Sequence, residues 1–241
     1  MMRFAAAVFL LISCTAVAAA PTVQLTPMHS HGADAKYPRL VAFPDQAIQR
    51  KVNALLTSKD AADASQRSDC LSSLKEAHIK PTADSYSLDI RVSYMSSRFA
   101  SLDVRETYYC GGPYPNDGVP DPLTIDLRSG SEVDWKKIFK PGVLPDESGS
   151  GTAKLVSMYQ TRYARQPKLI DGCKDAVDGG IDSVLLRLDA AKGGLVVTPD
   201  FPHAAQACAV EIAFSPSDIA PFIADKAFPA DLQQNAHKGG K

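Results

Sequence analysis

The stretch YYCGGPYPNDG, from Tyr108 to Gly118, gathers the residue types best suited to recognition. Its two glycines permit close backbone approach, its two prolines stiffen the chain, and its cysteine can anchor the segment. Tyrosine is enriched at the energetic centres of binding surfaces. The pattern fits a rigid loop that presents tyrosines to a partner, or a structural corner whose tyrosines pack on a sheet. The candidate binding residues are Tyr108, Tyr109, Gly111, Gly112, Pro113, Tyr114 and Pro115.

Other polar motifs lack the spacing that metal binding requires. Asn116, Asp117 and Gly118 precede Asp121, but neither the alternating acidic pattern nor the late glutamate of a calcium loop is present, so we expect a turn. His29 and His31 lie in the expected leader and lack convergent ligands, so we expect any metal binding there to be adventitious. We therefore expect no resident metal or cofactor.

The sequence shows no nucleophilic motif of the G-x-S-x-G type, and we expect its cysteines to be paired rather than reactive. His203 is expected to cap a local turn, and Arg162 and Arg165 to lie on a solvated helix face. Separation in space decides whether two carboxylates form a glycosidase pair, and we expect none of them to lie in an apolar setting that raises its pKa. These scattered carboxylates are Asp117, Asp121, Asp126, Asp182 and Asp189.

Composition describes an ordinary globular protein. The chain has 241 residues, of which 45% are hydrophobic and 22% are charged, and its formal net charge is −1. This balance indicates no partner chosen by bulk charge, so we expect no nucleic-acid binding. No long linker or repeat divides the sequence, which favours one folded domain from residue 37 to 228.

The N-terminus has the pattern of a secretory signal. Arg3 is followed by an apolar run from Phe4 to Ile12 and then by small residues, which predicts a signal peptide over residues 1–18. The run is too short to span a bilayer comfortably. Leu11–Cys14 also resembles a lipobox, so lipidation at Cys14 is the alternative. Either route places the protein outside the cytoplasm, as a periplasmic or secreted protein or as a lipoprotein.

Four further cysteines fit an oxidising compartment. Cys70, Cys110, Cys173 and Cys208 can form two disulfides in three connectivities. We favour Cys70–Cys110 and Cys173–Cys208, each of which closes a loop of roughly 35 to 40 residues.

Patterning along the chain predicts an α+β fold with N-terminal helices packed on an antiparallel meander sheet, a middle helix and closing strands. Residues 19–36 read as a mobile leader and residues 229–241 as a flexible tail. Pro44 and Asp45 open a helix, and residues 58–80 are expected to form a second one. Strict alternation predicts a half-buried strand at 86–94 with polar residues outward, and further strands are expected at 100–109, 123–127, 184–188, 195–197 and 210–214. Helices are expected near 135–139 and 155–163.

Several segments in this order resemble an exported domain family of unknown function, here called RsiV-like after a lysozyme-sensing anti-sigma factor that contains it. The family also occurs beside some peptidoglycan deacetylase domains. The similarity covers Tyr37 to Phe222, and Tyr109, Gly111 and Gly112 match its hallmark, although Pro113–Pro115 replaces the usual Ala-His-Gly. Residues 219–222 look like its closing strand-to-turn segment. The matching segments are YPRL, VNALL, YYCGGPYPNDG, LTIDLRSG and GGLVVTPDFPHAAQACAVEIAFSPSDIAPF.

The resemblance implies an envelope protein that binds something. The sequence contains neither a sigma-binding segment nor the metal-binding pattern of a deacetylase, so we do not expect those two activities. We expect a non-catalytic binding module whose ligand is an envelope protein, such as a lysozyme-type muramidase, or peptidoglycan. A hydrolase or deacetylase with an unrecognised site and a purely structural envelope protein remain as alternatives.

Overall fold

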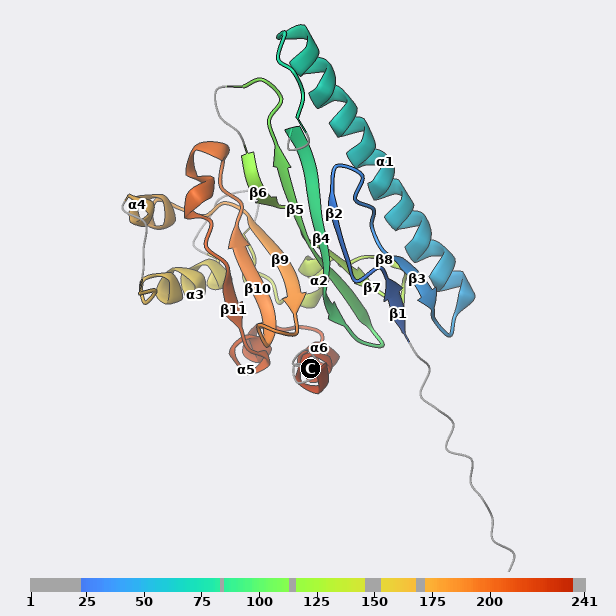
Figure 1. Ribbon diagram of the computed structural model, residues 1–241. Helices are drawn as coiled ribbons and strands as arrows, with labels where there is room; N and C mark the ends of the chain where they lie inside the picture. Colours follow the sequence, from blue (N-terminus) through green and yellow to red (C-terminus); the bar gives the residue numbers. More distant parts are fainter. Residues whose placement is uncertain (1–22, 83–84, 113–115, 146–152, 168–171, 236–241) are drawn as a thin grey trace, which may run out of the picture.

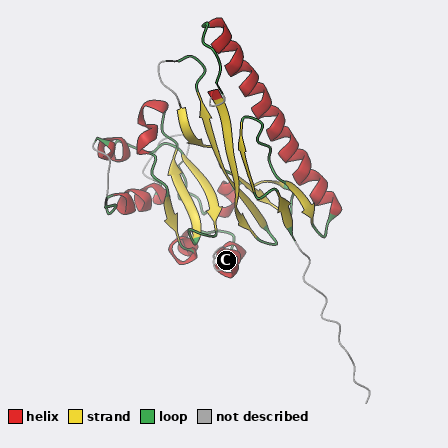
Figure 2. Ribbon diagram, in the orientation of Figure 1, coloured by secondary structure: helices red, strands yellow, loops and turns green. Residues whose placement is uncertain are grey.

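The computed structural model describes residues 23–82, 85–112, 116–145, 153–167 and 172–235. Within these residues, two antiparallel sheets, a two-stranded ribbon and several helices form an α+β fold (Figures 1 and 2). The expected fold class is therefore confirmed.

The larger sheet is built around one long hairpin, in which β4 (Tyr86–Met95) pairs with β5 (Phe99–Tyr108). The predicted alternation holds along most of β4, where Tyr86, Leu88 and Ile90 are buried. An irregularity in register between Val92 and Tyr94 then turns Tyr94 toward a different core. The remaining strands are β2 (His29–Gly32), which pairs with β4, and β6 (Asn116–Pro120), β7 (Leu123–Asp126) and β8 (Ser131–Glu132) on the β5 side.

One long helix, α1 (Gln46–Glu76), covers a face of this sheet (Figure 1). The Asp45 side chain accepts hydrogen bonds from the backbone N–H groups of Ala47 and Ile48, which confirms the predicted start. The predicted second helix over residues 58–80 is wrong as a separate element. The segment contains no glycine or proline, so nothing interrupts the helix before residue 76.

The predicted mobile leader is wrong from residue 23 onward. β1 (Gln24–Thr26) pairs with β3 (Arg39–Ala42), and β2 pairs with β4. Leu25 is 1% exposed and belongs to the core beneath α1. Burial of this apolar side chain and the strand pairing hold the segment in place despite its polar composition. Residues 19–22 and the expected signal peptide lie outside the described residues.

The smaller sheet has the order β11-β10-β9. As expected, β9 (Val184–Asp189) and β10 (Gly194–Pro199) pair with each other, and β11 (Ile212–Phe214) completes the sheet. Around it lie α2 (Trp135–Ile138), α3 (Lys154–Tyr163), α4 (Cys173–Asp178), η2 (His203–Cys208), α5 (Pro216–Ile219), η3 (Ala220–Phe222) and α6 (Ala227–Asn235).

Two expectations for the C-terminal part are wrong. Residues 219–222, expected to run from a strand into a turn, are helical because Ser215 and Asp218 form a capping box ahead of α5. The predicted tail from 229 begins instead inside α6, where Leu232 is 1% exposed and packs in the core. Residues 236–241 lie outside the described part of the chain.

The two sheets meet along a polar seam. The backbone N–H of Leu188 donates to Ser101 Oγ at 3.0 Å, and Ser93 Oγ donates to the Leu188 carbonyl at 2.6 Å. Side chains of the larger sheet thus bond to the backbone N–H and carbonyl of Leu188 on the edge strand β9, where these groups would otherwise be open to pairing with another strand. One hydrophobic core lies between α1 and the larger sheet, and a second surrounds the smaller sheet. Ser93, expected to face solvent, lies instead at this seam.

Candidate functional site

The predicted binding loop is described from Tyr108 to Gly112, whereas Pro113, Tyr114 and Pro115 lie outside the described residues. Cys110 forms a disulfide with Cys70 of α1, and Cys173 forms one with Cys208. Both favoured pairings are confirmed. The end of β5 is therefore covalently tied to the last turns of α1.

The described loop residues are held by several contacts. Gly111 has a φ of +93°, and a Cβ at this position would meet Ala77 and Ile79 at 3.6 Å. The Tyr109 backbone N–H donates to the Ser85 carbonyl at 2.9 Å. The rings of Tyr108 and Tyr86 lie 6.4 Å apart between centroids. Tyr108 thus packs on the sheet, as the corner interpretation expects, while both it and Tyr109 remain half-buried rather than fully buried.

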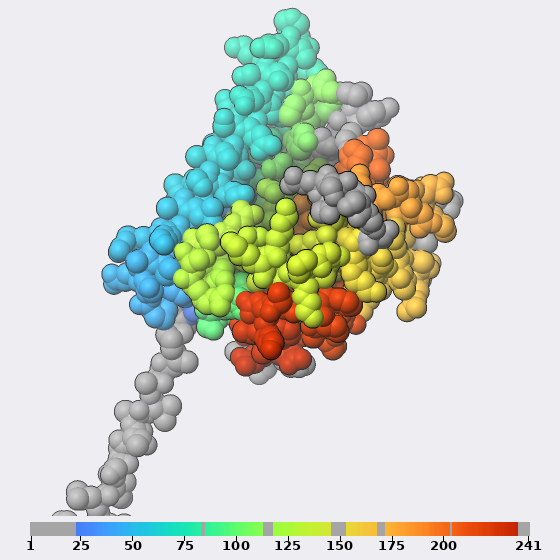
Figure 3. Space-filling model, turned by 180° about the vertical axis from the view of Figure 1, so that it is seen from behind, coloured from blue at the N-terminus to red at the C-terminus, as the bar shows by residue number. Residues whose placement is uncertain are grey.

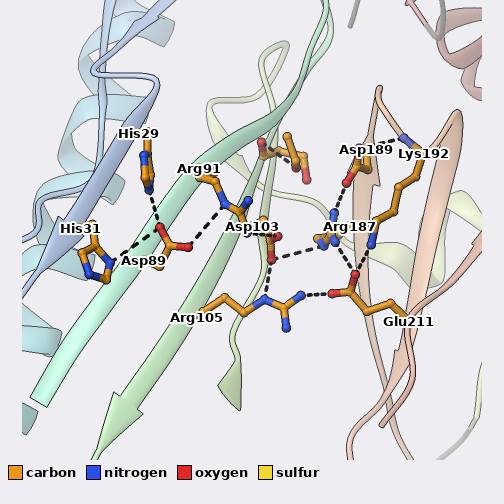
Figure 4. Close-up of polar contacts among 12 residues, drawn as sticks. His29, His31, Asp89, Arg91, Asp103, Arg105, Arg187, Asp189, Lys192 and Glu211 are labelled. Carbon is orange, nitrogen blue, oxygen red and sulfur yellow. Dashed lines mark hydrogen bonds and ion pairs between the residues drawn. The ribbon is translucent and has the colours of Figure 1, made fainter. Parts of the chain in front are cut away.

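A network of ion pairs links the two sheets (Figure 4). At its centre, the Arg187 side chain is only 4% exposed and contacts Asp103 and Asp189, and its Nη2 donates to Glu211 at 2.8 Å. Arg105 extends the network by pairing with both Asp103 and Glu211. Lys192 also donates to Glu211.

Electrostatics keep this network ionised. Burial by itself would raise the pKa of Glu211, but hydrogen bonds from Lys192 and Arg187 and their charges outweigh it and hold the pKa at about 2. Burial would likewise lower the pKa of Arg187, yet Asp103, Asp189 and Glu211 raise it. Because the network's central carboxylates are committed to cations, this arrangement is suited to joining the sheets rather than to proton transfer.

His29 and His31 lie at the other edge of the larger sheet, on β2 (Figure 4). His29 Nε2 hydrogen-bonds with Asp89 Oδ1, and His31 Nδ1 lies 4.0 Å from the same oxygen. Within the described parts of the chain, no group of three or more histidine, cysteine or acidic side chains has an arrangement that could hold a metal ion.

A second polar cluster lies beneath α1 and contains two carboxylates with raised pKa values. Glu106 on β5 is 8% exposed, and burial, followed by the charges of Asp121 and Asp63, raises its pKa to about 7. Burial and the charges of Asp121 and Asp60 also raise the pKa of Asp63, on α1, to about 6. Neither Glu106 nor Asp63 is among the five carboxylates singled out from the sequence.

Two tyrosines complete this cluster. Tyr37 hydrogen-bonds with Asp63, and its pKa is raised, chiefly by burial. The Tyr86 hydroxyl and Asp63 Oδ2 are buried, and neither has a hydrogen-bond partner among the described residues. The adjacent cavity, about 40 Å³, is lined in part by Asp60, Asp63 and Tyr86. It holds little more than a water molecule or two.

The sequence carried a usable signal for this cluster. Glu106 continues the inward series of Ala100, Leu102 and Val104 on β5. Asp63 likewise falls on the α1 face that contains the buried residues Val52, Leu56, Cys70 and Leu74. A charged residue at an inward position of a periodic element is the pattern that indicates a buried carboxylate.

The other residues singled out from sequence are dispersed. Asp126 pairs with Arg128 at 2.8 Å, and Asp121 and Asp182 are exposed, while the side chains of Asp117 and His203 are not described. Arg165 is exposed as expected, but Arg162 lies over the Phe214 ring at 4.3 Å and pairs with Asp218 at 2.8 Å. The expected solvated role of Arg162 is thus wrong. The chain also contains one Ser-x-x-Lys spacing, Ser72 to Lys75, and both residues are exposed on α1.

Comparisons with known proteins identify the fold. No protein-family model matches this sequence, and no curated protein does either. Among solved structures, a member of the DUF3298 family from Bacteroides fragilis is similar, with a TM-score of 0.52 and 13% sequence identity. The match covers 89% of this chain and 98% of that protein. DUF3298 is an uncharacterised family, so the likeness supports the α+β fold without assigning an activity.

The two disulfides are compatible with a position outside the cytoplasm. The cysteine pairs are at disulfide distance, which suits an oxidising compartment. Over the ranges that the structure describes, no helix combines the length and hydrophobicity that crossing a bilayer would need.

Proposed function

We propose that this protein is an exported, RsiV-like binding module of the cell envelope that is not catalytic. Its contact edge is the disulfide-pinned end of β5, from Tyr108 to Gly112. The observation that carries the proposal is the Cys70–Cys110 bond, because it fixes the start of a tyrosine-bearing loop to a 31-residue helix.

Rigidity is what makes this edge suitable for recognition. A surface already held in its bound shape loses little conformational entropy on association. Tyr109 is held by its backbone hydrogen bond to Ser85, and Gly111 lies against the end of α1. A half-buried tyrosine on such a support can contribute a large apolar area and one hydroxyl to a partner.

The ligand that we propose is an envelope protein, such as a lysozyme-type muramidase, or peptidoglycan. The resemblance noted from the sequence motivates the first, and export to the envelope motivates the second. The two candidate ligands predict different behaviour. A muramidase would be bound and inhibited in solution, whereas peptidoglycan would retain the protein on insoluble sacculi.

The test is to measure retention of the oxidised protein on immobilised muramidase and on purified sacculi, together with inhibition of muramidase turnover. Tyr109→Ala should weaken binding at least tenfold, about 1.4 kcal/mol or more, with the melting temperature nearly unchanged. Met28→Ala is the matched control, because Met28 is a large side chain, 56% exposed, at a different edge.

The proposal is contradicted if neither ligand is retained, or if Tyr109→Ala and Met28→Ala bind equally well. Retention on one ligand with selective loss in Tyr109→Ala would support it and would identify the ligand class.

One observation favours an enzymatic alternative. Glu106 and Asp63 have raised pKa values, of about 7 and about 6, as a general acid would. The adjoining cavity of about 40 Å³ is too small to admit a sugar ring, so we rank this alternative second. Turnover of purified peptidoglycan by the wild-type protein, lost in Glu106→Gln, would reverse the ranking. Repeating the assay with a chelator would show whether a metal takes part.

A further inference from the structure

A second surface of the molecule contains a pocket of about 550 Å³. Its walls come from the start of α2, from the chain at Leu144 and Pro145, and from β9 with the two residues that precede it. Figure 3 shows the face on which the yellow-green segment containing α2 lies near the middle. The volume falls within the range of small-molecule sites, about 300 to 1,000 Å³.

This pocket is separate from the proposed tyrosine edge. Its aromatic wall, Trp135, packs against the core around the smaller sheet, whereas Tyr108 and Cys110 pack against the core beneath α1. No residue of the tyrosine edge lines the pocket. The inference below therefore goes beyond the proposed function, and each can fail without the other.

Trp135 offers a fixed aromatic surface. Its indole lies 6.4 Å from the Phe139 ring and 6.1 Å from the Phe228 ring, the latter in an edge-on arrangement. Phe139 and Phe228 are buried, so they hold the indole against the core while it remains half-exposed at the pocket. The Asp134 side chain accepts from the Lys136 backbone N–H and so fixes the start of the helix that carries the indole.

The pocket combines an apolar floor with a hydrogen-bonding rim. Val133 and Leu186 are buried in the floor. Asp182 and Ser183, which precede β9, are exposed at the rim, whereas Trp135 comes from α2. A carboxylate accepts hydrogen bonds, and a serine hydroxyl both donates and accepts, so the rim can satisfy a ligand that carries several hydroxyl groups.

Charge at the rim is balanced. Asp134 and Asp182 contribute two negative charges, Lys136 contributes one positive charge, and Lys137 pairs with Asp134 at 3.1 Å. Such a rim does not select a strongly charged ligand, since electrostatic selection needs an excess of one sign. The lining instead suits a neutral molecule with one apolar face and polar groups around its edge.

We propose that this pocket binds a neutral saccharide. The apolar face of a pyranose ring lies on the indole of Trp135. Ring hydroxyl groups donate to the carboxylates of Asp134 and Asp182 and exchange hydrogen bonds with the Ser183 hydroxyl. The buried floor contacts ring carbons or an acetamido methyl group.

The chain supplies its own reporter for this proposal, because Trp135 is its single tryptophan. A saccharide that stacks on the indole should shift or change the intensity of the whole tryptophan emission. The experiment titrates the oxidised protein with N-acetylglucosamine oligomers of two to six units and, in parallel, with cello-oligosaccharides. We expect a saturable emission change with at least one series.

Variants of the rim test the assigned contacts. Asp182→Asn removes an exposed carboxylate without touching the core and should weaken saccharide affinity about tenfold, as loss of one charge-assisted hydrogen bond does. Asp69→Asn, an exposed carboxylate on α1, is the matched control and should bind as wild type. Trp135→Phe removes the reporter but keeps an aromatic ring, so its weakened binding is measured by calorimetry and its folding by thermal unfolding.

Tyr109→Ala separates this proposal from the preceding one, because it should leave the saccharide titration unchanged. The proposal is overturned if neither oligosaccharide series gives a saturable signal at millimolar concentration, or if Asp182→Asn binds as tightly as Asp69→Asn. The proposal is also overturned if the tryptophan emission changes with a short neutral aromatic peptide but with neither oligosaccharide series.

Discussion

Glu106 shows how one residue can depart from the pattern that surrounds it. It occupies an inward position of β5, opposite Leu88 of β4, and is 8% exposed. Burial and neighbouring carboxylates raise its pKa to about 7, so its protonated form is favoured in the folded protein. The same surroundings include Asp63 and two tyrosines whose pKa values are also raised.

This shift predicts a particular pH dependence of stability. The pKa of Glu106 in the folded protein lies above the ordinary carboxyl value. The contribution of Glu106 to the free energy of unfolding is therefore complete below about pH 4 and is lost as the pH rises through 7. Glutamine does not titrate, so Glu106→Gln does not lose stability in this way as the pH rises. Its free energy of unfolding relative to wild type should therefore increase between pH 5 and pH 8, by up to a few kcal/mol.

Urea unfolding of both proteins at pH 5, 6, 7 and 8 measures the effect. Asp69→Asn, on the exposed side of α1, is the control and should follow the wild-type pH profile. Parallel profiles for Glu106→Gln and wild type would show that Glu106 does not titrate in this range.

At the scale of elements, the two sheets meet along the polar seam described above. Serine side chains of β4 and β5 bond to the backbone of β9, and Arg187 on β9 meets Asp103 on β5. Directional contacts of this kind specify how the edge of one sheet rests on the other, whereas apolar contacts alone would permit sliding.

Arg187 is the central cation of this seam. Replacement by methionine leaves Asp103, Asp189 and Glu211 close together without their shared partner. We expect Arg187→Met to lower the free energy of unfolding by about 3 to 5 kcal/mol. Arg128→Met is the control, because the Arg128 side chain is 59% exposed and its ion pairs should contribute less than about 1 kcal/mol.

Denaturant unfolding at neutral pH compares the two variants. Equal, small losses of stability in Arg187→Met and Arg128→Met would show that the network does not hold the sheets together.

Across the whole molecule, the two disulfides reinforce different parts. Cys70–Cys110 joins α1 to the end of β5, and Cys173–Cys208 joins α4 to η2. Each therefore staples one of the two hydrophobic cores. They span 40 and 35 residues of sequence, so each constrains a substantial loop of the unfolded chain.

Cys110→Ser should lower the free energy of unfolding by about 2 to 4 kcal/mol under oxidising conditions. It should also release one thiol, at Cys70, while Cys173–Cys208 stays closed. Alkylation and peptide mapping give the thiol count, and urea unfolding gives the stability. A link from Cys70 to Cys173 or Cys208, or no change in stability, would contradict this assignment.

The sequence alone determined those features that depend on short windows. Neighbouring residues are enough to indicate the alternation in β4, the Asp45 cap of α1, the hairpin of β9 and β10, and the α+β class. For the four cysteines the sequence only favoured one of three connectivities, which is the one that the structure shows. Tertiary packing decided the rest. It buried Glu106 beside Asp63, enclosed Arg187 among three carboxylates, drew residues 23–36 into the sheets and formed the pocket beside Trp135. These arrangements join residues far apart in the chain, and their proximity and burial arise only when the sheets and helices pack together.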